Sequence, residues 1–389
     1  MQARSKSGRA EAARWLGALD MLRLVHASPG ITRADASRRL GITSGSATEI
    51  CARLRDLELL SERPAPPSGR GRPTTTLHAH RHGPLTAVVD VRHADWRAGV
   101  ADLEGRLTDL ATGRHRDRRP GAVIADLRGA IGALAERHGP RLRSVSISVT
   151  GTVQNNRVAQ ASGLGWQDVE IEPLAPGVPQ RVCNDATLAG LAVARRSHPD
   201  RSVLYLHIEV GIGGVLVDRG HALSGATGAG GEFGHLPLGD PAVPCPCGAM
   251  GCWDVAVDGR AMARLRGEPA PDDPRTYATE TMSDGAPAAR TAVGECAAFL
   301  GRGVAGLVNA LDPEIVAFGG LAPDLQQAAG EELDRAYAAG LMRFRRTAPP
   351  PLLPTEFGAD GPLRGAAESG FDEILTEGAL ARWADERRG

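Results

Sequence analysis

The N-terminal part of the chain alternates apolar and polar residues at the spacing of an amphipathic helix. Trp15, Leu19 and Leu22 share one face of a helix predicted over residues 11–26, and Pro29 marks its end. Apolar residues continue at helical spacing beyond this turn, so two further helices are expected there.

A short glycine turn separates these two further helices. Thr32 can cap the first, over residues 33–40, and Gly41 ends it. Thr43 or Ser44 can cap the second. This is the helix-turn-helix pattern, whose second helix enters the DNA major groove and brings its first residues to base edges. The exposed candidates for DNA contacts on that helix are Ser44, Ser46, Thr48, Glu49 and Arg53.

A basic segment rich in Pro and Gly follows the helices. Residues 64–73 hold Arg70 and Arg72 on a glycine backbone, and a run of Thr comes next. This composition predicts a β-wing whose arginines enter a narrow minor groove, where the negative potential attracts Arg. A linker between two domains would have the same composition. Both interpretations place a domain boundary near residue 83.

Beyond residue 86, short apolar strands alternate with helices. Strands are predicted at 87–91, 98–102, 145–149, 181–183, 203–208 and 315–318, and helices at 124–138, 186–196, 297–311 and 363–387. This alternation is typical of an α/β fold, and glycine turns follow several strands, where ligands bind in such sheets. The acidic insert at 269–284 is expected to be a surface loop.

The strongest chemical signal lies between residues 230 and 254. It combines one imidazole and three thiols, the ligand set of a closed tetrahedral zinc site: His235, Cys245, Cys247 and Cys252. Glu232 precedes the histidine in a glycine-rich loop, so zinc bound here would fix a loop carrying a carboxylate and an imidazole. The alternatives are zinc with a structural role alone, and a disulfide with one free thiol, which is rare in the cytosol.

Composition and charge narrow the class of protein. A chain of 389 residues with 42% hydrophobic residues can form two or three globular domains. Residues 1–82 carry 14 Lys or Arg and 7 Asp or Glu, a net +7, while the remainder carries −8 of the overall −1. A basic head suggests a polyanion as its partner. No apolar run approaches a membrane span and no signal peptide is evident, so we expect a cytoplasmic protein with no membrane partner.

Five features together resemble the ROK family of repressors, open reading frames and sugar kinases. They are the winged helix, Asn184-Asp185-Ala186, Gly231-Glu232-Phe233-Gly234-His235, the Cys-x-Cys-Gly-x-x-Gly-Cys knuckle and Gly319-Gly320. The resemblance covers nearly the whole chain. It implies a winged helix-turn-helix followed by an α/β, two-lobed, actin-like ATPase fold with ribonuclease-H-like lobes. The implied domains are 1–82 for the head and its wing or linker, 83–190 with 363–389 packing back for the first lobe, and 191–362 for the second lobe with the knuckle.

The resemblance also implies a sugar site. In the family's kinases the Asn and Asp of the Asn-Asp-Ala motif hold sugar hydroxyls, and the Asp is the general base. The acidic residue after the knuckle is Asp254 in place of the usual Glu, and Ser162 stands where the family has an Asn. The implied ligand-binding residues are Asn184, Asp185, Glu232, His235, Asp254 and Ser162.

Both phosphate loops depart from the family's pattern. Asp90 is followed by Val-Arg-His-Ala in place of glycines and Thr, and Glu209 opens the second loop, where it would repel a triphosphate. Bulky side chains keep backbone amides away from phosphate oxygens. We therefore expect no ATP cofactor, no kinase activity and only a vestigial role for Asp185. Arg92 and His93 are candidates for binding a sugar phosphate, or else solvated surface residues.

These features predict a sugar-responsive transcriptional regulator, most simply a repressor. Its partners would be operator double-stranded DNA and a sugar or sugar phosphate bound between the lobes, with structural zinc behind the Glu232 loop. A homodimer or homotetramer would present paired heads to a pseudo-palindromic operator. The alternatives are an ATP-dependent sugar kinase with a DNA-binding head, and a DNA-binding protein that responds to no effector.

Overall fold

The computed structural model describes residues 6–65 and 75–388, with side chains from residue 15 onward. The chain forms two compact units. Unit 1 comprises Met1–Ile147, Ile171–Val182 and Ala366–Gly389, and unit 2 comprises Ser148–Glu170 and Cys183–Gly365. Neither unit is one continuous stretch of sequence, because the chain passes between them several times.

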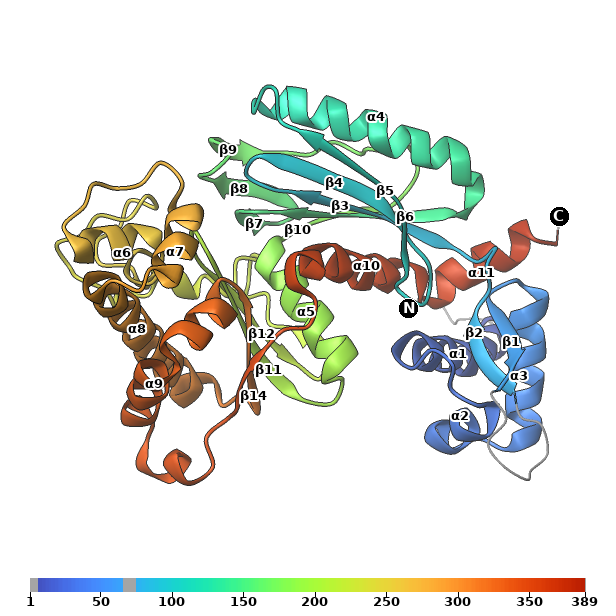
Figure 1. Ribbon diagram of the computed structural model, residues 1–389. Coiled ribbons are helices and arrows are strands. Elements are labelled where there is room, and N and C mark those ends of the chain that lie inside the picture. The colour runs from blue at the N-terminus through green and yellow to red at the C-terminus, as the bar shows by residue number, and fades with distance from the viewer. Residues whose placement is uncertain (1–5, 66–74, 389) are drawn as a thin grey trace. The chain divides into compact units, whose positions relative to one another are not determined.

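Unit 1 begins with a winged helix-turn-helix head. Its helices are α1 (Lys6–Ala27), α2 (Arg33–Leu40) and α3 (Ser44–Asp56), and the wing strands β1 (Leu60–Pro64) and β2 (Thr75–Ala79) pair antiparallel (Figure 1). Apolar side chains predicted to share the inner faces of these helices are buried: Leu19, Leu22, Ala47 and Leu54. The predicted winged helix is therefore confirmed.

Local capping explains where the helices of the head begin and end. Thr32 Oγ1 accepts a hydrogen bond from Asp35 N at 3.1 Å, which satisfies a free amide in the first turn of α2. Thr43 Oγ1 does the same for Ser46 N at 3.1 Å in α3. Gly41 ends α2 with a φ of 63°, a left-handed conformation that favours glycine.

The rest of unit 1 is built on a five-stranded sheet of order β10-β6-β3-β4-β5. Its strands are β3 (Leu85–Val91), β4 (Asp95–Ala101), β5 (Leu107–Arg114), β6 (Leu142–Val149) and β10 (Gln180–Asn184). Strands β3, β4 and β5 form an antiparallel meander, and α4 (Pro120–His138) contacts all three of them (Figure 1). Every residue of β3 is buried, including Thr86 and Asp90, as expected for a strand covered on both faces of its sheet.

The described chain ends with two helices, in the region where the sequence predicts a single helix over residues 363–387. They are α10 (Gly361–Ile374) and α11 (Glu377–Glu386), and Thr376 Oγ1 caps the second by accepting from Ala379 N. Helix α10 begins in unit 2 and ends in unit 1, whereas α11 lies within unit 1 and contacts α1.

Unit 2 contains a second five-stranded sheet, of order β13-β12-β11-β14-β15. Its strands are β11 (Ser202–Glu209), β12 (Gly211–Asp218), β13 (His221–Ala222), β14 (Ile315–Gly320) and β15 (Leu352–Pro354). Strand β11 pairs antiparallel with β12 and parallel with β14. The helices of this unit are α5 (Asp185–Ser197), α6 (Gly259–Arg266), α7 (Pro274–Ser283), α8 (Pro287–Leu311) and α9 (Ala322–Gly340).

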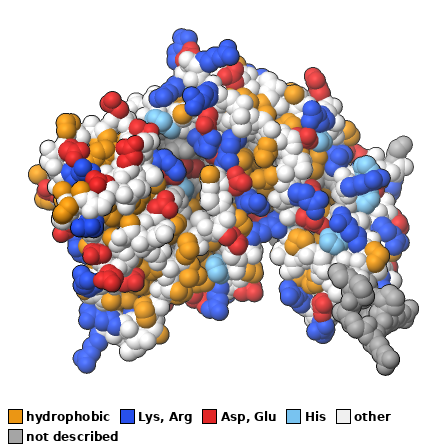
Figure 2. Space-filling view, viewed as in Figure 1, with side chains coloured by type: hydrophobic (Ala, Val, Ile, Leu, Met, Phe, Trp, Pro, Cys, Tyr) orange, Lys and Arg blue, Asp and Glu red, His pale blue; other side chains and the backbone are white. Residues whose placement is uncertain are grey.

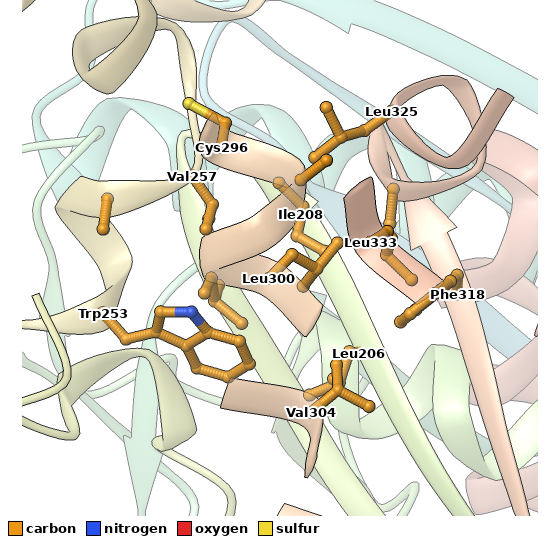
Figure 3. Close-up of a cluster of buried hydrophobic side chains, with 14 of the residues drawn as sticks. Leu206, Ile208, Trp253, Val257, Cys296, Leu300, Val304, Phe318, Leu325 and Leu333 are labelled. Atoms are coloured by element: carbon orange, nitrogen blue, oxygen red, sulfur yellow. The ribbon is translucent and has the colours of Figure 1, made fainter. Parts of the chain in front are cut away.

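An apolar core joins this sheet to α8 and α9. Leu206 and Phe318 of the strands pack with Leu300 and Val304 of α8 (Figure 3). Trp253 is fully buried in the same core, and its indole N–H donates to a backbone carbonyl of α8 at 3.2 Å. Burying a large apolar side chain contributes about 1.5–3 kcal/mol, so Trp253 anchors the segment that follows the cysteine knuckle.

Two sequence predictions for unit 2 need correction. Most of the acidic insert at 269–284 is the helix α7, because Asp273 caps it by accepting from Arg275 N and Thr276 N. Helix α8 is long and apolar enough to cross a membrane, which the sequence prediction overlooked. Within the described residues, 67% of its apolar window is buried, as in the core helix of a globular protein.

A small antiparallel sheet also belongs to unit 2. It consists of β7 (Thr152–Gln154), β8 (Arg157–Ala161) and β9 (Trp166–Val169), and Asn155 N donates to Thr227 O at 2.9 Å. This bond ties the sheet to a glycine-rich loop of unit 2. The compact units therefore differ here from the predicted domain boundaries, which assign this sheet to the first lobe.

On the face shown in Figure 2, basic and acidic side chains are interspersed.

Candidate functional site

Four side chains that can bind a metal ion converge after β13. One ligand atom from each lies within 4.8 Å of the others: His235, Cys245, Cys247 and Cys252. The Cys247 and Cys252 Sγ atoms are 3.7 Å apart, and His235 Nδ1 is 3.8 Å from Cys245 Sγ. A tetrahedral site with zinc–sulfur distances of about 2.3 Å has edges of about 3.8 Å between ligands. The donor set and its spacing therefore fit zinc.

The backbone of the knuckle folds the thiols toward one point. Cys245 N donates to Ala249 O at 2.8 Å, and Gly248 N donates to Cys245 O at 3.0 Å. Gly248 and Gly251 have φ values of 97° and 68°, which residues with a Cβ rarely adopt. Burial, together with the neighbouring thiols, raises the pKa of Cys252 to about 12. A divalent cation would favour the thiolate, and its binding would release protons.

His235 links the knuckle to the glycine-rich loop before it. Its Nδ1 faces Cys245, while its Nε2 lies 3.7 Å from Glu232 Oε2. A carboxylate beside the second nitrogen of a metal-binding imidazole orients the ring. The side chains of Glu232 and His235 are each 37% exposed. A ligand can therefore reach both of them.

A hollow within unit 2 lies at Glu232. Its lining consists of Val153, Asn184, Glu232 and the glycine-rich segments 213–214 and 228–231. An amide and a carboxylate converge on a surface otherwise made mainly of backbone. Such a surface offers hydrogen-bond donors and acceptors to polar groups of a ligand. The structure thus brings together two predicted sugar-binding residues that are far apart in the sequence.

Close backbone packing explains the glycines around this hollow. A Cβ on Gly231 would lie 2.2 Å from Gly214 O, and one on Gly214 would lie 2.8 Å from Tyr205 O. Gly231 also has a φ of 95°. A larger residue at Gly231 would push the Glu232 loop away from β12, and one at Gly214 would push β12 away from β11.

The Asn184-Asp185 pair starts α5. Asn184 Oδ1 caps the helix by accepting from Thr187 N at 2.9 Å, and its Nδ2 donates to Gly151 O at 2.9 Å. Asp185 Oδ1 accepts from Asn184 Nδ2 at 3.1 Å and from Ala186 N at 2.9 Å. Asn184 therefore reaches the hollow already oriented, whereas Asp185 is not part of its lining.

Three other predicted sugar ligands lie outside this lining: His235, Asp254 and Ser162. Asp254 Oδ1 accepts from Ile212 N at 2.6 Å, and its Oδ2 is 3.4 Å from Arg260 Nη2. Asp254 therefore holds the start of β12. Ser162 lies on an exposed turn after β8, where it accepts from Gln160 Nε2 at 3.2 Å. Sugar contacts by Asp254 and Ser162 stay predictions.

Sequence reasoning missed the ion pairs behind Asp254. Asp258 is fully buried, caps α6 and lies 2.6 Å from Arg260 Nη2. Burial raises the pKa of Asp258, and the Arg260 guanidinium opposes that rise. The network fixes Asp254, and through it the backbone at Ile212 that leads to the lining glycines. The sequence held one signal for this network, namely an Asp followed two residues later by an Arg at the start of α6.

Ion pairs also occupy the predicted first phosphate loop. Asp90 is 1% exposed, and its Oδ2 lies 2.9 Å from Arg97 Nη2. Arg92 lies 2.6 Å from Asp95 Oδ1, and His93 is exposed. Because the Arg92 guanidinium is already paired, the structure weakens the hypothesis that it binds a sugar phosphate.

The surroundings of Glu209 correct another expectation. Its carboxylate pairs with Arg275 of α7, so its charge is offset and simple repulsion of a triphosphate no longer follows. His207 Nε2 lies 3.6 Å from Glu209 Oε1. The Tyr205 hydroxyl packs under Gly319, where a Cβ would lie 2.0 Å from Tyr205 Oη. Side chains thus fill the region around this loop.

The predicted DNA-contacting residues fall into three groups. Ser44, Ser46, Thr48 and Glu49 are exposed at the start of α3, as the helix-turn-helix pattern predicts. Arg53 is half-buried with its guanidinium 4.6 Å from the centroid of the Trp15 ring, so the prediction that it lies exposed is wrong. Arg70 and Arg72 lie outside the described residues.

Two arginines of α2 were missed as candidates for DNA contacts. Arg38 and Arg39 are exposed and border a surface hollow with Ser28 and Thr32. The first helix of a helix-turn-helix crosses the DNA backbone, so arginines on it suit phosphate contacts. The adjacent Arg-Arg pair before the glycine turn was the available signal.

Comparison with known proteins agrees with this architecture. Residues 89–369 match the ROK family, and residues 16–71 match the MarR family. The glucokinase of Streptomyces coelicolor is 27% identical over 315 residues, which span 73% of this chain and 96% of that enzyme. The N-acetylmannosamine kinase of Salmonella newport is 29% identical over 245 residues, 60% of this chain and 82% of that kinase.

A solved structure extends the likeness to the head. It is a ROK family transcriptional regulator described as a homologue of the E. coli MLC protein, with 21% identity and a TM-score of 0.76. The match covers 97% of this chain and 100% of that one, so the fold is shared from the winged helix to the body. The chain belongs to the ROK family, with a winged helix-turn-helix of the MarR type in front of the family's sugar-kinase fold.

Proposed function

We propose that this protein is a sugar-responsive transcriptional repressor. Its winged helix binds operator DNA, and a sugar binds in the hollow of unit 2. The observation that carries the proposal is the presence in one chain of an exposed helix-turn-helix and a hollow lined by Asn184 and Glu232. An effector alters operator affinity when it prefers one of two arrangements of the protein.

The charge and surface of the head support DNA as its partner. Residues 1–82 carry a net +7, and the exposed start of α3 offers short polar side chains for base edges. Two heads of a homodimer, or of pairs within a homotetramer, read the half-sites of a pseudo-palindromic operator. Such a protein acts in the cytoplasm, where operator DNA is accessible.

The chemistry of the hollow supports a hexose as the effector. A glutamate accepts hydrogen bonds from hydroxyls and an asparagine both donates and accepts them. The relatives named as glucokinase and N-acetylmannosamine kinase make glucose and N-acetylmannosamine the first sugars to test. A structural zinc ion at the Cys3His cluster holds His235, and with it the loop that carries Glu232.

We also propose that the protein is not a kinase. Its kinase relatives favour the opposite, and the family resemblance implies that Asp185 stands at the position of the kinases' general base. However, Asp90 pairs with Arg97, side chains fill the region around Glu209, and no Gly-Gly-Thr follows Asp90. A coupled ATPase assay with both sugars tests this point, and turnover above the sugar-free rate would establish the enzyme.

The direct test is binding to DNA from the protein's own promoter region. The titration uses glucose, N-acetylmannosamine and their 6-phosphates. A shift in operator affinity with one sugar supports the regulator and identifies its effector class. Binding that no sugar changes would replace the proposal with an effector-independent regulator, and absence of DNA binding would reject it. Thermal unfolding provides a second readout, because a ligand at 100 times its Kd stabilises by about 2.7 kcal/mol.

A further inference from the structure

A buried histidine–glutamate pair ties the head to the body of unit 1. His26, near the end of α1, has its Nε2 2.9 Å from Glu368 Oε2 and its Nδ1 2.7 Å from Leu103 O. The two side chains of the pair are 11% and 2% exposed, and the ring packs edge-on against Phe371. Such a buried contact is costly to break.

A second histidine–glutamate pair holds the wing strand β2 to Glu104, the residue next to Leu103. His78 Nδ1 of β2 lies 3.0 Å from Glu104 Oε1, and Glu104 follows Leu103 directly. The turn between β4 and β5 therefore contacts both α1 and β2. In addition, the Trp383 indole of α11 donates to Leu57 O at 2.8 Å. Several directional bonds thus fix the head to the body of unit 1, in contrast to a flexible linker.

Glu368 lies on α10, whose residues up to Gly365 belong to unit 2 and whose residues from Ala366 onward belong to unit 1. In unit 2 this helix packs directly on α5, since a Cβ at Gly365 would lie 1.8 Å from Leu188 O. In unit 1 a Cβ at Gly370 would lie 2.1 Å from Thr86 Oγ1, and Ser144 Oγ donates to Gly370 O at 2.9 Å. Each end of α10 is therefore in close contact with its own unit.

We propose that α10 transmits ligand binding in unit 2 to the DNA-binding head, with the Glu368–His26 pair as its end point. Asn184, the N-cap of α5, lines the hollow, and α10 packs on α5 at Gly365. Packed helices move as rigid elements, so a displacement of α5 shifts α10. The buried pair then carries that shift into α1. This inference rests on the function proposed above, because it requires a ligand in the hollow and DNA at the head.

Hydrogen exchange on the full chain tests the connection without sugar or DNA. The variants are Glu368→Ala and the milder Glu368→Gln, and the matched control is Glu373→Gln on the same helix, which removes an ion pair with Arg181. We expect faster exchange in α1 and also in α5 for both Glu368 variants, and in neither helix for the control. Changes confined to α1 and the end of α10 would overturn the proposal. If the alanine variant does not fold, the glutamine variant carries the test.

Operator binding with and without sugar separates this inference from the proposed function. We expect Glu368→Gln to bind the operator and glucose or N-acetylmannosamine within about threefold of the wild type. The effect of the sugar on operator affinity should fall at least about fivefold, the lower end of typical coupling factors. A variant with the full sugar effect would refute the connection and leave the function intact. If neither sugar alters operator binding by the wild type, these sugars are not effectors and the proposed function is not supported. Hydrogen exchange then still decides whether α5 and α1 are connected.

Discussion

Two glutamates of unit 2 stand beside glycine turns and have opposite surroundings. Glu232 lines the hollow and has an imidazole nitrogen 3.7 Å away. Glu209 is paired with the Arg275 guanidinium and also lies near His207. A guanidinium is always charged and binds a carboxylate strongly. The imidazole of His235 lies 3.7 Å from Glu232, beyond hydrogen-bond distance, and so leaves that carboxylate open to a ligand. The partner, more than the glycine turn, decides which glutamate can bind a sugar.

The largest predicted effect is the loss of sugar affinity at Glu232 when the metal is removed. Cys247 is the exposed cysteine of the cluster, so Cys247→Ser removes one candidate ligand with little change in packing. We expect zinc content to fall and sugar affinity to drop roughly 10- to 100-fold, because His235 then no longer holds the Glu232 loop. Metal analysis and calorimetric titration with the effector sugar measure the two results.

Cys51→Ala is the control for this prediction. Cys51 is buried in the head, and burial raises the pKa of its thiol to about 11, as expected for an inert core cysteine. Zinc content and sugar affinity should both stay at the wild-type level in this variant. Unchanged sugar affinity in a zinc-free Cys247→Ser protein would show that the metal does not support the sugar site.

Neutralising each glutamate in turn tests the comparison directly. Glu232→Gln keeps the size of the side chain but exchanges charged hydrogen bonds for neutral ones. We expect sugar affinity to fall about tenfold, since a charged hydrogen bond contributes about 1–1.5 kcal/mol more than a neutral one. Glu209→Gln should change sugar affinity by less than about twofold. Equal losses in the two variants would contradict the distinction between the glutamates.

Features set by neighbours in sequence could be predicted from the sequence. The caps at Thr32 and Thr43 and the glycine at Gly41 define α2 and α3 through contacts within a few residues. The cysteine knuckle was equally predictable, because its ligands lie in one short segment. The strands β3, β4, β6, β11 and β14 were found because their apolar runs are continuous or alternate clearly.

Features that depend on distant partners could not be predicted in this way. Arg53 fits an exposed DNA-contacting position by spacing, but Trp15 of α1 covers it. Glu209 finds Arg275 on a helix that the sequence suggested was a loop. Asp254 was expected at the sugar and instead holds Ile212 N. In each case the pairing follows from tertiary packing, which the local pattern does not encode.

The smallest predicted effect concerns Glu209, the glutamate that is paired with Arg275. Arg275→Ala removes the guanidinium that pairs with Glu209, at a site where the arginine side chain is 54% exposed. Exposed ion pairs contribute about 0.2–1 kcal/mol, so we expect the free energy of unfolding to fall by less than about 1 kcal/mol. Sugar affinity should not change, because neither residue lines the hollow. Once Arg275 is removed, the free carboxylate of Glu209 should repel ATP, so we expect Arg275→Ala not to bind ATP. A binding assay compares its ATP affinity with that of the double variant Arg275→Ala/Glu209→Gln. Measurable ATP binding in the single variant would mean that Arg275, and not the altered loops, is what keeps the nucleotide out.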